Sequence, residues 1–120
     1  MTIKLTHEII AAAYELVRTL PPFNGWNLPD HEDVKFEVVK DPKYFAACAV
    51  ERVGRKLKPT IYVSARCVGY VRTLLDAMMH ECIHLHMALT GQDTRAEHNA
   101  AFHNLARRVC KIHGLDFKAF

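Results

Sequence analysis

The chain has 120 residues, half of them apolar, and a formal net charge of +3 at pH 7. This length suits one domain with a hydrophobic core and is too short for two, so we expect residues 1–120 to form a single domain. No apolar run approaches the roughly 18 residues of a membrane span, and no cleavable signal pattern precedes residue 20. These features argue against a membrane protein and predict an intracellular one, in the cytoplasm, nucleoid or nucleus.

The four cysteines, at positions 48, 67, 82 and 110, form no CxxC pair. Their spacing therefore fits neither a zinc ribbon nor a disulfide framework. We expect reduced thiols buried in the core, as in a reducing compartment such as the cytoplasm.

The N-terminal stretch predicts a helix. Thr6 is a suitable N-cap, and apolar residues recur at helical spacing from Ile9 to Leu20, where Pro21-Pro22 ends the pattern. Residues 23–31 contain Gly, Asn, Pro and Asp and predict a loop, with Trp26 as a lid over the core.

Three short segments predict strands. Residues 34–38 alternate apolar and polar side chains, residues 44–50 follow a turn at Asp41-Pro42, and residues 60–64 are β-branched and aromatic. Short connections predict that all three are antiparallel neighbours. The open edge of such a sheet can take up an extended peptide as a further strand.

The segment that carries the chemistry is the sequence HECIH at residues 80–84. It lies in an apolar run, 74–89, without Gly or Pro, which predicts a helix from about residue 70 to 89 that ends at Gly91. At 3.6 residues per turn, His80 and His84 lie on one face, so both imidazoles can reach one metal ion.

Catalytic zinc sites use three protein ligands and an open position for water, whose pKa falls to about 7. Glu81, next to the first ligand, is the expected general base. The alternative is a buried histidine-rich helix without metal, but an unpaired buried glutamate would be costly there. Asp76, one turn before His80, could accept the outer N–H of that ring, although solvent exposure is the simpler interpretation.

Residues 94–97 have the form of a capping box and predict the start of a last helix, which runs to about His113 and ends at Gly114. One face of that helix is predicted to present His98, Phe102, Leu105, Val109 and Ile112.

If this face packs on the HExxH helix, His98 in its first turn points toward His80 and His84. His98 is therefore the predicted third metal ligand, with Glu97 as the alternative. His86 and His103 point away from these faces and are expected on the surface or in structural roles.

The segments PTIYVS, TLLDAMMHECIHLH and EHNAAFHNLARRV resemble the SprT-like (Spartan) zinc metalloprotease domain, over roughly residues 5 to 115. The resemblance implies an α+β, zincin-like minimal metalloprotease: N-terminal helix, three-stranded antiparallel sheet, HExxH helix and C-terminal helix. It also implies one zinc ion held by His80, His84 and His98, with Glu81 as the catalytic glutamate. Phe102 would be the core aromatic that follows the third ligand.

Two departures from the family pattern bear on function. Glu97 and Asn99 replace the glycines that flank the third histidine in the family, and residues 1–120 include no zinc ribbon, DNA-binding tail or adaptor-binding tail. Members of the family cleave proteins bound or crosslinked to DNA, so the resemblance implies protein or peptide substrates, with DNA as a further partner.

Three functions remain open at this point. The first is a SprT-like zinc endopeptidase, and the second a repressor-cleaving protease of the ImmA/IrrE type, with the acidic segment around Glu97 supplying a ligand. The third is a non-catalytic, zinc-stabilised module that binds DNA or protein through the basic residues of 52–58 and 107–111. The complete HExxH favours an enzyme, because only catalysis needs Glu81 beside an open zinc position.

Overall fold

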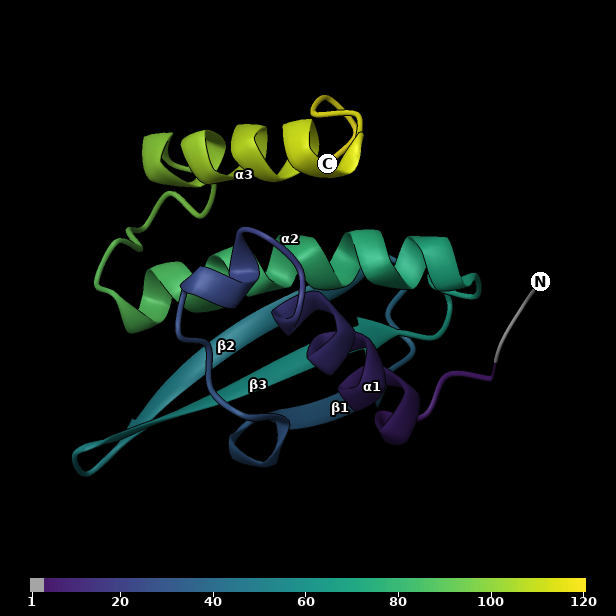
Figure 1. Ribbon diagram of the computed structural model, residues 1–120. Coiled ribbons are helices and arrows are strands. Elements are labelled where there is room, and N and C mark those ends of the chain that lie inside the picture. Colours follow the sequence, from purple (N-terminus) through teal and green to yellow (C-terminus); the bar gives the residue numbers. More distant parts are fainter. Residues whose placement is uncertain (1–3) are drawn as a thin grey trace.

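In the computed structural model, which describes residues 4–120, three α-helices pack with a three-stranded sheet (Figure 1). The predicted α+β class is thereby confirmed. Short 3-10 helices at Phe23–Gly25 and His31–Asp33 connect the first helix to the first strand. The main elements, in chain order, are α1 (His7–Arg18), β1 (Lys35–Val39), β2 (Ala46–Val53), β3 (Lys56–Ser64), α2 (Val71–Leu89) and α3 (Ala100–His113).

The elements form three layers. Helices α1 and α2 cover one face of the sheet, and α3 lies over α2 on the side away from the sheet (Figure 1). Ile61 and Val63 of β3 are fully buried, and so are Ile83 and Leu85 of α2. The core therefore lies between sheet and helices, and α2 is the central helix of the domain.

The sheet has the order β1–β3–β2, with β2 antiparallel and β1 parallel to β3. The prediction of three antiparallel neighbours was therefore wrong for β1, and the sheet is mixed. The connection 40–45 crosses the end of β3, where Ser64 N–H donates to the carbonyl of Phe45 and Ala65 N–H to that of Val39, at 2.8 Å each. Two strand spacings are about 10 Å, which this connection can span. Central placement buries the apolar side chains of β3 more fully than an edge position would.

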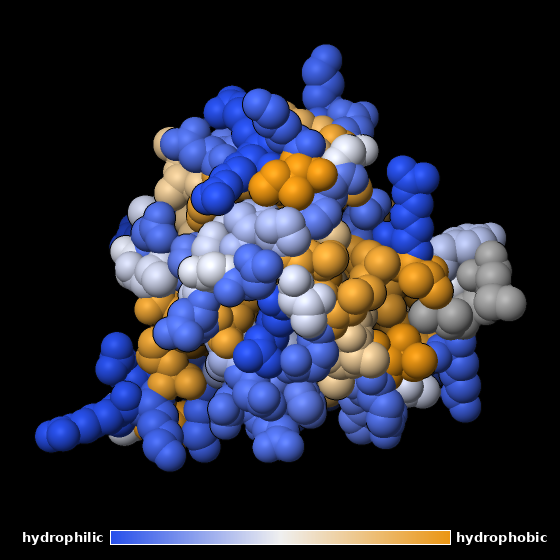
Figure 2. Space-filling view, viewed as in Figure 1, coloured by the Kyte–Doolittle hydropathy of each residue, from blue (hydrophilic) through white to orange (hydrophobic). Residues whose placement is uncertain are grey.

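The β2–β3 hairpin is longer than predicted. Residues 52–58, which lie between the second and third predicted strands, continue the pairing as far as Val53 opposite Lys56. Gly54, at φ 63°, provides the left-handed residue that a tight hairpin turn requires. The basic side chains Arg52, Arg55, Lys56 and Lys58 are all exposed, and the hairpin end is hydrophilic in Figure 2.

The first helix begins and ends as predicted. The Thr6 side chain accepts the Ile9 N–H at 3.2 Å, and the helix stops before Pro21. Trp26 lies half-buried on the core and stacks on His86, with 4.4 Å between ring centres. The expected lid role of Trp26 and the structural role of His86 both agree with this contact.

All four cysteines are free thiols, but only Cys82 and Cys110 are buried. Cys48 and Cys67 are half-buried because each lines a cavity beside α2, so the expectation of four core thiols was wrong for these two. Within residues 4–120, no helix has both the length and the hydrophobicity needed to cross a membrane.

Candidate metal centre

Helix α2 determines the positions of two histidines. It begins after the N-cap Tyr70, whose backbone is extended, and Gly91 ends it in the left-handed conformation at φ 72°. The Gln92 N–H donates back to the Met87 carbonyl at 2.8 Å, as in a Schellman cap. Because His80 and His84 are one turn apart on this helix, their Nε2 atoms lie 3.2 Å from each other.

A third imidazole joins them from a different element. His98 lies in the turn before α3, and its Nε2 atom is 3.2 Å from Nε2 of His80. One nitrogen from each of the three rings lies within 4.8 Å of the other two. The structure thus brings together the three predicted ligand residues. Glu97 is not part of this group, although it lines the neighbouring cavity.

The route by which His98 reaches the site differs from the prediction. Residues 94–97 do not cap a helix, and α3 begins only at Ala100. Asn99 is the N-cap: its side-chain oxygen accepts the Phe102 N–H at 2.9 Å, while its amide donates to Gln92 O and Thr94 Oγ1. Asn caps a helix as well as Thr does, and this one is also held by the preceding loop. His98 is therefore a loop residue and not a member of the first helical turn.

The buried face of α3 is shifted as a result. Its buried residues are Phe102, Ala106, Val109 and Cys110, whereas Ile112 is 44% exposed. Phe102 lies behind the histidine cluster, with its ring centre 4.5 to 4.9 Å from those of His80, His84 and His98. This position agrees with the core role that the family resemblance implies for Phe102.

Burial sets the protonation state of the two helical histidines. Together with the smaller effect of the neighbouring imidazoles, it lowers the pKa of both His80 and His84 to about 4. Both rings are therefore neutral at pH 7 in the metal-free protein. Neutral imidazole is the form that binds zinc.

Glu81 is a buried carboxylate, with only 4% of its surface exposed. Burial, reinforced by the negative charge of Glu97, raises the pKa of Glu81 to about 8. No hydrogen bond to its side chain forms among residues 4–120, and its oxygens are not fully enclosed but open onto the two cavities that Glu81 lines. Ionisation of a carboxyl group desolvated in this way is costly, and a cation beside it would offset that cost. This observation, together with three converging neutral imidazoles, indicates that the site fits a divalent metal such as zinc.

The raised pKa of Glu81 gives a testable pH dependence. In the metal-free protein the folded state holds this proton up to about pH 8, whereas an unfolded glutamate releases it near pH 4.5. Stability from this group is therefore present below pH 4.5 and lost as pH rises to 8. We expect the free energy of unfolding of Glu81→Gln, minus that of the wild type, to grow by about 2 to 4 kcal/mol between pH 5 and 8.

Urea unfolding in the presence of a chelator measures this difference. The matched control is Glu51→Gln, which changes an exposed carboxylate and should give a nearly constant difference over the same pH range. A constant difference for Glu81→Gln as well would show that the Glu81 carboxylate is not desolvated.

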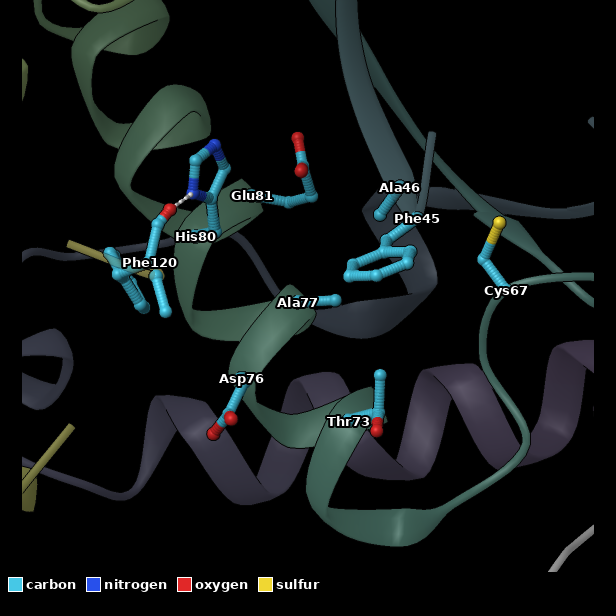
Figure 3. Close-up of a pocket in the computed structure, with 10 residues that line it drawn as sticks. Phe45, Ala46, Cys67, Thr73, Asp76, Ala77, His80, Glu81 and Phe120 are labelled. Carbon is cyan, nitrogen blue, oxygen red and sulfur yellow. Dashed lines mark hydrogen bonds between the residues drawn. The ribbon is translucent and has the colours of Figure 1, made fainter. Parts of the chain in front are cut away.

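Two cavities meet at His80 and Glu81. The first, of about 480 Å³, lies between Phe45 and Phe120 (Figure 3), and Thr73 and Asp76 line its other end. The second, of about 390 Å³, is lined by the residues of β2 and the 93–98 loop. Both contain Ala46 at the start of β2. A long cleft therefore passes the histidine cluster on both sides.

Strand β2 forms one wall of this cleft. It pairs with β3 on one side only, and no other strand within residues 4–120 lies along its outer edge. Ala46, Cys48 and Val50 face α2 and line the second cavity. An open strand edge thus runs beside Glu81, as the sequence analysis anticipated for the sheet in general.

The outer nitrogen of His80 has a partner that the sequence did not predict. Its Nδ1 atom is 3.1 Å from the main-chain oxygen of Phe120 (Figure 3). Asp76, considered for this role, lines the first cavity instead and has no hydrogen-bond partner within residues 4–120. Sequence offers no signal for this contact, because every residue carries a carbonyl and the two residues are 40 positions apart.

Glu15, Asp30 and His31 form a second group close enough to hold a metal. The Arg18 guanidinium already lies 2.6 Å from the Glu15 carboxylate and 3.8 Å from that of Asp30. This cluster is therefore a surface ion-pair network with its own cation.

The chemistry available at the centre follows from this geometry. Three neutral imidazoles can hold one metal ion, and a buried carboxylate beside them can accept a proton. The cleft and the open strand edge leave room for an extended ligand. No protein-family model matches the chain, and no curated protein sequence matches it.

Proposed function

We propose that the chain is a zinc-dependent endopeptidase of the HExxH type. His80, His84 and His98 would hold one zinc ion, and Glu81 would be the general base. The observation that carries the proposal is the convergence of three imidazole nitrogens beside the buried Glu81 side chain, with which no cationic side chain of residues 4–120 pairs. Structural zinc sites are closed by four protein ligands, whereas catalytic sites use three and keep one position open.

When bound, zinc supplies a Lewis acid that acidifies water and polarises a carbonyl group. Glu81 lies at the meeting point of both cavities, so its oxygens can accept a proton from water in the cleft. The same carboxyl group can return that proton to the departing amine. Phe102 holds the three rings in place from behind and leaves their nitrogens directed toward the cleft.

The substrate class follows from the wall of the cleft. A peptide in extended conformation can pair with the outer edge of β2, which runs past His80 and Glu81. Side chains on either side of the cleaved bond would then enter the two cavities. The larger cavity, with Phe45, Ala77 and Phe120 in its walls, suits an apolar side chain.

The resemblance to the SprT-like domain supports the same proposal. The order of helix, sheet, HExxH helix and closing helix is the one that the resemblance implies, whereas the sheet is mixed and not antiparallel throughout. The flanking residues Glu97 and Asn99 depart from the family pattern, and Asn99 takes over the capping of α3.

Metal removal tests the proposed function directly. Purified protein is expected to contain about one zinc ion per chain and to cleave casein. Dialysis against a chelator should abolish cleavage, and one equivalent of zinc should restore it. Protein that contains no zinc, or that cleaves equally well without it, would contradict the proposal.

The basic hairpin favours a substrate bound to an acidic surface such as DNA. Four exposed cations at its end, Arg52, Arg55, Lys56 and Lys58, have no acidic partner within 4 Å among residues 4–120. Each phosphate contact contributes about 0.9 to the slope of log affinity against log salt concentration. We therefore expect the double variant Arg55→Ala/Lys56→Ala to flatten that slope by about 2.

Fluorescence anisotropy with a labelled duplex at several salt concentrations measures these slopes. The matched control is Lys40→Ala/Lys118→Ala, which removes the same charge from exposed positions outside the hairpin. Equal slopes for both variants would rule out the hairpin as a DNA contact, and a flat response in the wild type would rule out DNA as a partner.

A further inference from the structure

We propose that residues 115–120 are a positioning element of the metal centre, in which the main-chain oxygen of Phe120 fixes the tautomer of His80. The proposal rests on the proposed metal centre. It assigns a role to the segment after α3 that neither the HExxH motif nor its spacing indicates.

The hydrogen bond at Nδ1 determines which nitrogen carries the proton. The main-chain oxygen of Phe120 carries no hydrogen and can only accept, so Nδ1 of His80, 3.1 Å away, must be the protonated nitrogen (Figure 3). Neutral imidazole carries one N–H, which leaves the lone pair on Nε2. That nitrogen lies 3.2 Å from Nε2 of both His84 and His98, on the side where a metal would bind.

Several contacts hold residues 115–120 in place. After the α3 C-cap Gly114, at φ 69°, the Leu115 N–H donates to Cys110 O at 3.0 Å and turns the chain back. The Arg107 guanidinium lies 5.0 Å from the centre of the Phe117 ring. The side chains of Leu115, Phe117 and Phe120 are half-buried against the core.

The Phe120 side chain reinforces the same position. Its ring centre is 5.4 Å from that of His80, and the Phe102 ring is 4.9 Å from His80. Phe120 and Ala119 also line the larger cavity, where Phe120 lies beside His80 and Asp76 lies one turn earlier on α2 (Figure 3). One residue thus contributes both to the orientation of His80 and to the wall of the cleft.

His80 differs in this respect from the other two imidazoles. Within residues 4–120, no hydrogen bond to Nδ1 of His84 or of His98 is formed. Among residues 4–120, His80 is therefore the one ring of the three whose Nδ1 is held by a hydrogen bond. Loss of residues 115–120 should act on His80 alone. Outer hydrogen bonds of this kind typically contribute about 10- to 100-fold to metal affinity.

Two measurements test the proposal. Nitrogen-15 NMR of the histidine rings reports the tautomer of each one in zinc-free protein, and competition with a chromogenic chelator gives the zinc affinity. In the wild type we expect His80 to be protonated at Nδ1. Deletion of residues 119–120 should abolish that preference and weaken zinc binding about 10- to 100-fold.

Three further variants distinguish the effect of the Phe120 main-chain oxygen from that of the residues around it. Arg107→Ala/Phe117→Ala leaves residue 120 in the chain but undocks the segment, so it should reproduce the effect of the deletion. Phe120→Leu keeps the main-chain oxygen and an apolar side chain but loses the ring contact with His80, so it is expected to keep the wild-type tautomer and to lose less zinc affinity than the deletion. Lys118→Ala changes an exposed side chain of the same segment and is the control for substitutions in residues 115–120.

The outcomes distinguish this proposal from the proposed function. Unchanged tautomer and zinc affinity in the folded deletion variant would overturn the positioning role, as would a loss in Phe120→Leu as large as that in the deletion. If the wild type shows the expected tautomer and binds zinc but cleaves no peptide, the endopeptidase proposal fails and the positioning role stands.

Discussion

Replacement of Glu81 by Gln is expected to lower kcat for peptide hydrolysis by about 10²- to 10⁴-fold while about one zinc ion per chain is retained. Gln keeps the size of the side chain but cannot accept a proton from water. The carboxylate is not part of the imidazole cluster, so its loss should not remove a metal ligand. Turnover of a fluorogenic casein substrate, measured beside zinc content, checks both parts of the expectation.

The matched control for this variant is Glu97→Gln. Glu97 is an exposed carboxylate that lines the same cavity, and its replacement should change kcat less than about tenfold. A Glu81→Gln protein that keeps both zinc and wild-type kcat would exclude general-base catalysis by this residue. It would then favour the alternative of a non-catalytic, zinc-stabilised binding module.

The second large effect is expected at His98. Replacement by Ala removes the Nε2 atom that lies 3.2 Å from that of His80, and leaves two of the three converging nitrogens. Loss of a direct ligand should weaken zinc binding by more than the roughly 100-fold that an outer hydrogen bond contributes. Chelator competition gives the affinity, and the visible spectrum of the cobalt-substituted protein reports the number of ligands.

Glu97→Ala distinguishes the two protease hypotheses. In the endopeptidase proposed above, zinc affinity should stay within about threefold of the wild type, because Glu97 lies outside the imidazole cluster. Retained affinity in His98→Ala with a loss in Glu97→Ala would instead support the carboxylate ligand of the ImmA/IrrE type. His103→Ala, an exposed histidine on α3, controls for general effects of removing an imidazole.

Local interactions explain why much of the site could be predicted. Periodicity and the absence of Gly and Pro predict α2, and a regular helix then places residues four apart on one face, whatever surrounds them. His80, Glu81 and His84 therefore needed only their own helix to be placed. Thr6 begins its helix, and Gly91 and Gly114 end theirs, as predicted, because capping depends on neighbouring backbone groups.

Competing local signals explain the error at α3. Residues 94–97 match the capping-box pattern, yet Asn99 forms the cap through contacts with both the helix and the loop before it. Each segment alone is compatible with a helix start, and only packing of Phe102 behind the histidines selects the later one.

The sequence by itself determined the α+β class, α2 and the HExxH geometry, because these depend on residues within a few positions of one another. Only the tertiary structure decided that β1 lies parallel to β3, that His98 reaches His80 from a loop, and that Nδ1 of His80 is hydrogen-bonded to the main-chain oxygen of Phe120. Such contacts join residues far apart in the chain, and the burial and hydrogen bonding that select them arise only when the whole core has formed.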